Sequence, residues 1–561
     1  MGNKLSLLYK DANKKLQLLA DTPEFVKDLQ LDGILEFMSC GSKNMNSKRV
    51  ITSVLSELCE DTEDITYRSD ILQEFAQKPQ VFMDLQCALE KLIPIERERQ
   101  LSSRKRADVS SEYKLGNGVG MLMGYCGICK ELDNVLKLHG NRYSSEGLTK
   151  LSETVSEYIG NESYNKLENI LMALKKCVKG YARLKLNASL DTSFKLKDAI
   201  VLELDSNGFF DREISKDKSI KEHLSNRFKK LLKLGRGNKN TYVIKQMDYI
   251  LEENANEIKD KIFTNIAQIL DVMTSNVSSF LRKISEEMLF YEGALKLVNE
   301  MKSLGLTTSR AELAPWDRRS MIIEGMYDLS FALYLSDKGC SSPMDSIVTN
   351  DVCISGADRI QVITGPNQGG KTTYIRAIGI LQVLAQAGIP VPASKAVVSP
   401  VDQLFTHFPV EERPESNEGR LGEELSRILL ILENATPKSL VFMNEAFAST
   451  NSREGSLIAQ DILSAFAVIG AKCFFVTHLY ELAIRLDDIN KGIGSMGEGY
   501  GRLISMAAQF EEKPGDSEQE AGGVIRRNYK ILPGVPSKSS FAADIAAQFG
   551  IRYIDFLEYR N

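Results

Sequence analysis

A glycine-rich run in the last part of the chain constrains the fold more than any other feature of the sequence. The run Gly365-Pro-Asn-Gln-Gly-Gly-Lys371-Thr372-Thr373 fits the pattern G-x-x-x-x-G-K-[ST]. The alternating residues 360–364 before it predict a short strand, and residues 374–384 after it have helical apolar spacing. In a strand, glycine-rich loop and helix, backbone N–H groups can surround phosphate oxygens. The sequence therefore predicts a phosphate-binding loop in an α/β domain rather than a glycine-rich turn formed by chance.

The residue types in this loop predict ATP and Mg²⁺ as ligands. Lys371 is placed to reach the β- and γ-phosphates, and the hydroxyl of Thr372 can ligate Mg²⁺. The N-terminus of the following helix adds partial positive charge. We therefore expect the nucleotide contacts to come from Gly365, Pro366, Asn367, Gln368, Gly369, Gly370, Lys371, Thr372 and Thr373.

Composition and charge narrow the class of protein. A chain of 561 residues should hold two to four domains, and a net charge of −5 means that nucleic-acid contact would need a local basic patch. The sequence has no secretory leader pattern and no uncharged stretch of membrane-spanning length, so we expect no membrane partner. Nine scattered cysteines suit a reducing cytoplasm. Because Cys126 and Cys129 lie in an apolar run, buried helix packing is favoured over a zinc or redox site.

Apolar spacing predicts a helical first part and a very long helix in the middle. Residues 79–92 and 148–159 have apolar residues three and four apart, whereas residues 194–204 alternate only loosely and stay open between helix and strand. Residues 242–300 contain no proline and no glycine except Gly293. They predict one long helix, or two, and a helix of that length is a lever or a coiled arm.

Two further apolar runs end in polar residues that suit nucleotide chemistry. Residues 439–443 predict a strand that ends at Asn444 and Glu445. In nucleotide-hydrolysing sites the first of two such residues lies near the Mg²⁺ ion, and the second is a glutamate beside the attacking water. Glu445 fits the second role, with a solvated helix cap as the alternative, and Asn444 can hold a metal-bound water without adding charge. Residues 474–477 lead into His478, which is placed for the γ-phosphate or the water. Taken alone, His478 would be interpreted as a core or surface histidine.

The order of these motifs resembles that of the MutS family of DNA mismatch-repair ATPases, a branch of the ABC-type ATPases. Gly365–Thr373 parallels the family's GPNMGGKST, Ser439–Gly455 parallels S-L-V-L-M-D-E-I-G-R-G-T-S-T-x-D-G, and Thr477-His478 parallels T-H. The resemblance is close over residues 345–561, whereas residues 1–344 resemble the family by period and layout. Further parallels lie at residues 67–75, 389–393, 401–406, 424–436, 529–534 and 539–542.

The resemblance implies a multidomain protein with an all-α core and long lever and clamp helices, followed by an α/β P-loop ATPase domain of the ABC type. The implied limits are 1–195 for the helical core, 196–305 for the lever and clamp, 306–344 for the return to the core and 345–561 for the ATPase domain. It also implies a homodimer that ATP closes around double-stranded or branched DNA. Lys371, Glu445 and His478 would be the catalytic residues, and Thr372 and Asn444 would lie at the metal, the latter through water.

The chain departs from the family pattern at several positions. Asn444 replaces the metal-shell aspartate, so we expect slow hydrolysis. Gly419 and Arg420 replace the Ser-Thr pair that reaches the partner's γ-phosphate, and Arg420 is either a cation acting in trans or an exposed loop charge. Ile347 replaces the aromatic residue that stacks on adenine and would offer an apolar wall. We also expect no mismatch-reading domain, no connector domain and no endonuclease-like tail, and residues 290–292, although they read Phe-Tyr-Glu, are interpreted as ordinary helix sequence.

A basic segment lies where the family places its clamp. Residues 212–245 contain 11 Lys/Arg and 3 Asp/Glu, a net charge of +8 in an acidic chain. Phosphate contact needs several cations without sequence-reading geometry, so this segment predicts DNA binding, with a solvated helical face as the alternative. We expect the contacts to come from Lys229, Lys230, Lys233, Arg236 and Lys239.

The sequence thus indicates an ATP-dependent DNA-binding clamp that acts in repair or recombination. Two alternatives stay open. The first is a nucleotide-switched binding module with very weak hydrolysis, which Asn444 favours. The second is a related ATPase that acts on RNA, on ribosomes or on a protein partner.

Overall fold

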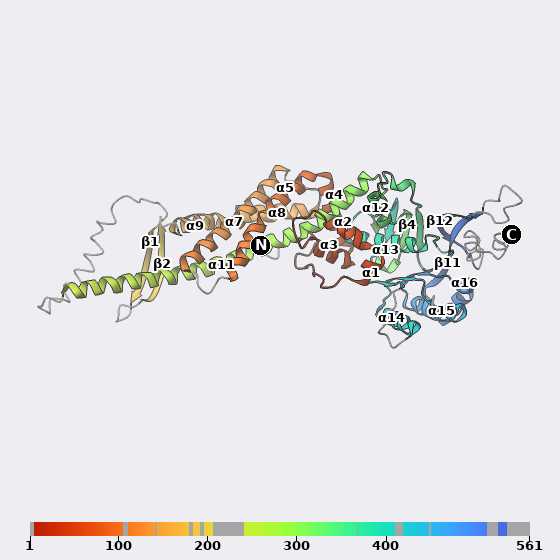
Figure 1. Ribbon diagram of the computed structural model, residues 1–561. Coiled ribbons are helices and arrows are strands. Elements are labelled where there is room, and N and C mark those ends of the chain that lie inside the picture. Colours follow the sequence, from red (N-terminus) through yellow and green to blue (C-terminus); the bar gives the residue numbers. More distant parts are fainter. Residues whose placement is uncertain are drawn as a thin grey trace, which may run out of the picture. The chain divides into compact units, whose positions relative to one another are not determined.

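The computed structural model describes residues 5–104, 110–140, 143–178, 183–190, 196–205, 240–366, 368–409, 419–447, 450–512 and 525–535 (Figure 1). Contacts divide the chain into two units. Of the described residues, the first unit contains Leu5 and those within 78–143 and 148–285, and the second contains those within 6–77, 144–147 and 286–561.

The first unit is built from helices and one antiparallel pair of strands. The predicted helices at residues 79–92 and 148–159 are confirmed as α5 and α8. The elements are α5 (Pro79–Glu90), α6 (Leu92–Arg104), α7 (Ser111–Leu138), most of α8 (Glu146–Gly160), α9 (Glu162–Val178), β1 (Arg183–Leu190), β2 (Leu196–Asp205) and the part of α11 (Asn240–Ser303) that ends at Ser285.

The sequence left residues 194–204 open between helix and strand, and residues 196–204 belong to strand β2. β2 pairs with β1 in antiparallel register, from Arg183 opposite Asp205 to Leu190 opposite Leu196. The domain limit expected at residue 195 lies between these two paired strands, and the proposed limits stay predictions. Residues 206–239, which include the expected DNA contacts Lys229, Lys230, Lys233, Arg236 and Lys239, lie outside the described residues.

Residues 240–303 form one helix rather than two, the 64-residue α11. Phe290 and Tyr291 near its end are fully buried, and the hydroxyl of Tyr291 donates a hydrogen bond to the carbonyl of Leu7. The interpretation of the Phe-Tyr-Glu sequence as ordinary helix is therefore confirmed. Among the described residues, no helix combines the length and the apolar character that a membrane crossing requires.

The closely spaced cysteines belong to α7 and pack in the core, as the sequence indicated. Cys126 and Cys129 are both buried and both free thiols. Burial raises the pKa of Cys126 to about 11 and that of Cys129 to about 12. Thiols held in the protonated form are poor nucleophiles and poor metal ligands, so this pair serves packing.

The second unit combines helices with two sheets, so the chain has the helical plus α/β layout that the sequence indicated. Its α-helices are α1 (Glu24–Asp28), α2 (Leu31–Ser39), α3 (Ser47–Ser56), α4 (Thr62–Gln77), the end of α11, α12 (Leu329–Asp337), α13 (Lys371–Ala387), α14 (Arg420–Asn434), α15 (Ser452–Ile469), α16 (Tyr480–Ile484) and α17 (Leu486–Met496). Two short 3₁₀ turns, Trp316–Arg318 and Pro343–Asp345, lie before and after α12.

The larger sheet of this unit is mainly parallel. Its order is β12-β11-β6-β10-β9-β8, and only β12, at one edge, runs antiparallel to its neighbour among the described strands. The smaller sheet has the order β3-β7-β4-β5. The strands are β3 (Glu312–Leu313), β4 (Met321–Met326), β5 (Asn350–Ile354), β6 (Asp358–Thr364), β7 (Lys395–Val398), β8 (Leu404–His407), β9 (Leu440–Asn444), β10 (Lys472–Val476), β11 (Arg502–Glu512) and β12 (Ile525–Pro533).

Both faces of the larger sheet are covered, which explains its continuous apolar strands. Val441 and Met443 of β9 belong to one core cluster with residues of α14, α15, α16 and α17. The intervening Phe442 stacks on Phe474 of β10, with ring centroids 5.5 Å apart, on the opposite face. Figure 1 shows α13 on one side of this sheet and α14, α15 and α16 on the other. With both faces closed, the open position for a ligand is the edge where the parallel strands end.

Candidate functional site

Three predicted motifs meet at the carboxyl edge of the larger sheet. β6 leads into the glycine-rich loop, β9 ends at Asn444 and β10 leads into His478. The strands are direct neighbours, because Val476 of β10 lies opposite both Ile363 of β6 and Asn444 of β9. Segments that are far apart in the sequence therefore present their side chains to one place.

The loop has the backbone conformation that its glycines allow. Gly365 has φ +140° and Gly370, which caps α13, has φ +85°. A Cβ atom at residue 365 would lie 2.7 Å from the Cβ of Ala508, so β11 leaves no room for a side chain there. Gln368 also has a positive φ, and Asn367 lies outside the described residues. The loop turns back on itself before α13 begins, as a phosphate-binding loop must.

Lys371 is buried inside this loop and is 4% exposed. Its Nζ donates to the carbonyl of Gly365 at 2.9 Å and to that of Pro366 at 2.8 Å. Burial lowers the pKa of Lys371 to about 8, and the carboxylate of Glu445 acts in the opposite direction. In the described part of the structure this ammonium group contacts neutral carbonyl oxygens, so it would gain strongly from an anionic oxygen.

The two residues expected at the metal are in contact. Thr372 Oγ1 donates to Asn444 Oδ1 at 3.2 Å. Mg²⁺ accepts neutral oxygens of this kind, directly or through a bound water, but Thr372 and Asn444 would account for only part of an octahedral shell. Among the described residues no group of three or more His, Cys, Asp or Glu side chains could hold a metal. The site therefore fits Mg²⁺ only when phosphate oxygens and water complete the shell.

Glu445 and His478 lie together beside the loop. Nε2 of His478 is 3.1 Å from Oε1 of Glu445. Burial, helped by the charge of Lys371, lowers the pKa of His478, so the imidazole is neutral near pH 7. The backbone of Glu445 has φ +53°, a left-handed conformation that costs free energy in a residue other than glycine. Such strain is common where a functional side chain must be aimed.

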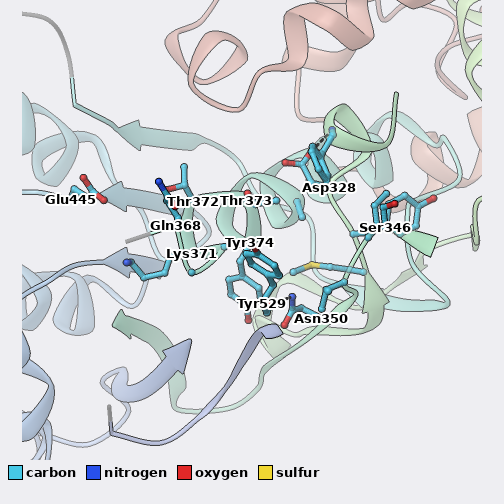
Figure 2. A pocket seen from close by; sticks show the side chains of 18 residues that line it. Asp328, Ser346, Asn350, Gln368, Lys371, Thr372, Thr373, Tyr374, Glu445 and Tyr529 are labelled. Carbon is cyan, nitrogen blue, oxygen red and sulfur yellow. Dashed lines mark hydrogen bonds between the residues drawn. The ribbon is translucent and has the colours of Figure 1, made fainter. Parts of the chain in front are cut away.

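A pocket of about 420 Å³ lies beside the loop; Glu445 is among its lining residues, whereas His478 and Asn444 are not. Figure 2 shows Glu445 at one end, Asp328 and Ser346 at the other, and the loop residues between them. Ile347 lines the pocket, as its place in the sequence pattern suggested. The other lining residues are Met326, Tyr327, Phe331, Val348, Asn350, Gln368, Gly369, Gly370, Lys371, Thr372, Thr373, Tyr374, Ala377 and Tyr529.

Tyr529 is a functional candidate that the sequence did not reveal. Its ring lies over Gly370, where a Cβ atom would be 3.5 Å from Cδ1, and its own φ is +57°. Asn350 holds it in place, since Nδ2 donates to the carbonyl of Tyr529 at 3.0 Å and Oδ1 accepts the N–H of Ile531 at 2.8 Å. No local pattern links residues 350 and 529, so only the fold brings this ring to the pocket.

Of the two residues expected in the trans loop, only Gly419 can be located relative to this pocket. Gly419 precedes α14 with extended backbone and is absent from the pocket lining, while the side chain of Arg420 lies outside the described part of the structure. A role in a second subunit stays a prediction for both.

The fold and the pocket define a class of protein, α/β chains with a glycine-rich loop at the carboxyl edge of a parallel sheet. Comparison with protein families refines this class. Residues 361–496 match the model of MutS domain V, and residues 60–304 match the model of the MutS2 N-terminal domain. Two separate parts of the chain are therefore similar to MutS-family proteins.

Individual relatives show the same similarity. The chain is 27% identical to an "Endonuclease MutS2" of Lacticaseibacillus casei over 290 residues, which cover 51% of this chain and 33% of the relative. It is 40% identical to a "DNA mismatch repair protein MutS" of Chlorobium phaeobacteroides over 141 residues, or 25% of this chain and 16% of the relative. It is 29% identical to the protein of the same name from Borreliella afzelii over 273 residues, which cover 47% of this chain and 30% of the relative. The chain thus spans a third or less of the length of these relatives.

Proposed function

We propose that this chain binds ATP, hydrolyses it slowly and uses the cycle to control its binding to DNA. The observation that carries the proposal is the convergence of Lys371, Thr372, Asn444, Glu445 and His478 at one edge of one sheet. The match to MutS domain V covers all of these residues and supports an ABC-type ATPase domain.

The loop end of the pocket suits a triphosphate. Lys371 supplies an ammonium group, and the N-terminus of α13 points its free N–H groups at the same place. Mg²⁺ held there would neutralise charge on the phosphate oxygens. Thr372 would contact the ion directly and Asn444 through a water molecule. We therefore infer that phosphate binding depends on these residues more than on any carboxylate.

The part of the pocket beside the loop suits a base. Tyr529 and Ile347 offer an aromatic and an aliphatic surface, and an adenine ring gains from stacking between such surfaces. A pocket of about 420 Å³ is also within the size range of small-ligand sites. Tyr529 would take over the aromatic role that Ile347 lacks.

Glu445 is the group that would orient the attacking water and accept its proton. Neutral His478, hydrogen-bonded to that carboxylate, would hold it in position and contact the γ-phosphate. Because Asn444 adds no negative charge, it would leave the water near the metal less activated than an aspartate would. Slow turnover follows from this arrangement.

Two observations support the proposal that the ATP cycle controls DNA binding: the resemblance to DNA-repair proteins and the basic segment at residues 212–245. Relatives of this chain are named for DNA mismatch repair, and the +8 segment could bind phosphates. We infer a homodimer in which Gly419 and Arg420 act on the nucleotide of the opposite subunit, and closure of the dimer around double-stranded or branched DNA. A cytoplasmic location is part of the same proposal.

The second candidate is a nucleotide-switched module that hardly hydrolyses ATP, and Asn444 is the residue that favours it. Measuring Mg²⁺-dependent turnover and ATP affinity of the parent and of Asn444→Asp decides between the two. We expect Asn444→Asp to raise turnover about tenfold while the affinity changes less than about threefold. If both proteins bind ATP but neither hydrolyses it, the nucleotide-switched module is the better description of the function.

The nature of the nucleic acid needs its own experiment. Binding of linear duplex DNA, branched DNA and structured RNA should be compared across a range of salt concentrations. The proposal expects tight, salt-sensitive binding of DNA and, if shape is selected, of branched DNA above linear DNA. Stronger binding of RNA would favour the alternative of an ATPase that acts on RNA or ribosomes.

A further inference from the structure

A carboxylate on α14 contacts the segment that carries Glu445. Oε1 of Glu424 accepts the backbone N–H of Phe447 at 2.9 Å. The same oxygen lies 3.2 Å from Nε2 of His407, the last residue of β8. His407 is 3% exposed and its Nδ1 has no hydrogen-bond partner in the described structure. Nε2 is therefore the nitrogen through which the imidazole holds the carboxylate.

The segment that Glu424 contacts is strained. Glu445 has φ +53° and Phe447 has φ +64°, so two residues with side chains adopt the left-handed conformation within three positions. Such a conformation persists only when the surroundings hold it. The N–H of Glu445 donates to Val476 at 2.9 Å, and that of Phe447 donates to Glu424. One of the backbone N–H groups of the segment is thus held by a side chain of α14.

The anchor lies close to the start of α14. Glu424 is four residues after Arg420, the first residue of the helix, which is about 6 Å along the axis. Ile428 and Ile431 of the same helix are buried in the core beside the sheet. A helix behaves as a stiff rod over this distance, so a shift of its first turn reaches Glu424 and, through it, Phe447.

We propose that Glu424 is a positioning residue that links the start of α14 to Glu445, with His407 as its second anchor. Glu424 sets the conformation of residues 445–447, and these aim the carboxylate of Glu445 at its place beside His478. The inference rests on the proposed function only in assigning Glu445 to hydrolysis. The following variants distinguish this positioning role from a hydrogen bond that only stabilises the fold.

The first test compares turnover with nucleotide affinity. Glu424→Ala removes the anchor, and we expect kcat to fall about tenfold to a hundredfold while the Kd for ATP stays within about twofold. Glu424→Gln keeps a carbonyl oxygen for the N–H of Phe447 and should recover most of the rate. Glu433→Ala, an exposed carboxylate near the far end of α14, is the matched control and should behave as the parent. A parent-like kcat in Glu424→Ala, or an equal loss of affinity and rate, would overturn the proposal.

The second test does not need hydrolysis. Hydrogen exchange measured by mass spectrometry on a peptide containing Phe447 reports the amide that Glu424 accepts. We expect exchange at least about tenfold faster in Glu424→Ala than in the parent, and parent-like exchange in Glu424→Gln and Glu433→Ala. Unchanged exchange in Glu424→Ala would overturn the inference. A parent that binds ATP without turnover would contradict the hydrolytic function, while the exchange data would still decide whether Glu424 holds the segment.

Discussion

Replacing Lys472 by methionine should stabilise the second unit, and the gain should depend on pH. Lys472 begins β10 and is 2% exposed. Its Nζ makes one hydrogen bond that the structure describes, a long contact of 3.3 Å to the carbonyl of Ser399. Burial lowers the pKa of Lys472 from its usual 10.5 to about 7. Methionine has a similar length and needs no charge partner, so it fits the same space.

The magnitude follows from proton linkage. Between the pKa of the folded state, about 7, and that of the unfolded chain, 10.5, the unfolded chain binds more protons, so this lysine makes stability rise with pH. Placing this lysine in the core lowers the free energy of unfolding by about 4 kcal/mol near pH 7 and by about 2 kcal/mol near pH 9. Lys472→Met removes this cost, so its advantage over the parent should be about 2 kcal/mol larger at pH 7 than at pH 9.

The assay is denaturant unfolding followed by the fluorescence of Trp316, the single tryptophan of the chain, which lies in the second unit. Lys395→Met is the matched control, because Lys395 is exposed and begins β7 of the same unit. Its effect should be small and equal at both pH values. If the stability difference between Lys472→Met and the parent were the same at pH 7 and pH 9, the reasoning from a buried, discharged lysine would be wrong.

Four predictions concern function. Lys371→Ala should abolish ATP binding without unfolding the chain, and normal binding by the folded variant would contradict the assignment of the loop. Because burial lowers the pKa of Lys371 to about 8 and only the charged form attracts phosphate, ATP affinity of the parent should fall as the pH rises above about 8, but not in Lys371→Arg. Glu445→Gln should trap ATP and stabilise a dimer in light scattering, and a strict monomer with nucleotide bound would exclude composite sites. Replacing Lys229, Lys230 and Lys233 by Glu should flatten the salt dependence of DNA binding and leave basal hydrolysis near normal. Unchanged DNA binding would favour the alternative that this segment is a solvated helical face.

The sequence by itself determined those features that depend on neighbouring residues. The period of apolar residues predicted α5, α8 and α11, and the glycine-rich pattern predicted the loop between β6 and α13. Asn444, Glu445 and His478 were found because parallel strands end at a common edge, so a polar residue after an apolar strand has a predictable place. The loosely alternating residues 194–204 could not be assigned in this way, because pairing with β1, and not the local pattern, makes residues 196–205 a strand.

Only the tertiary structure decided which distant residues complete the site. Tyr529 reaches the pocket because Asn350, 179 positions earlier, holds its backbone, and no local signal connects them. Glu424 meets Phe447 and His407 because α14 packs beside β8 and β9, a contact that no spacing in the chain encodes. Burial of Lys472 likewise depends on what covers the start of β10, since the same residue in an exposed strand would be an ordinary surface lysine. Local periodicity thus specifies elements and the edge where they end, whereas long-range packing sets the geometry and the charge state of the groups that meet there.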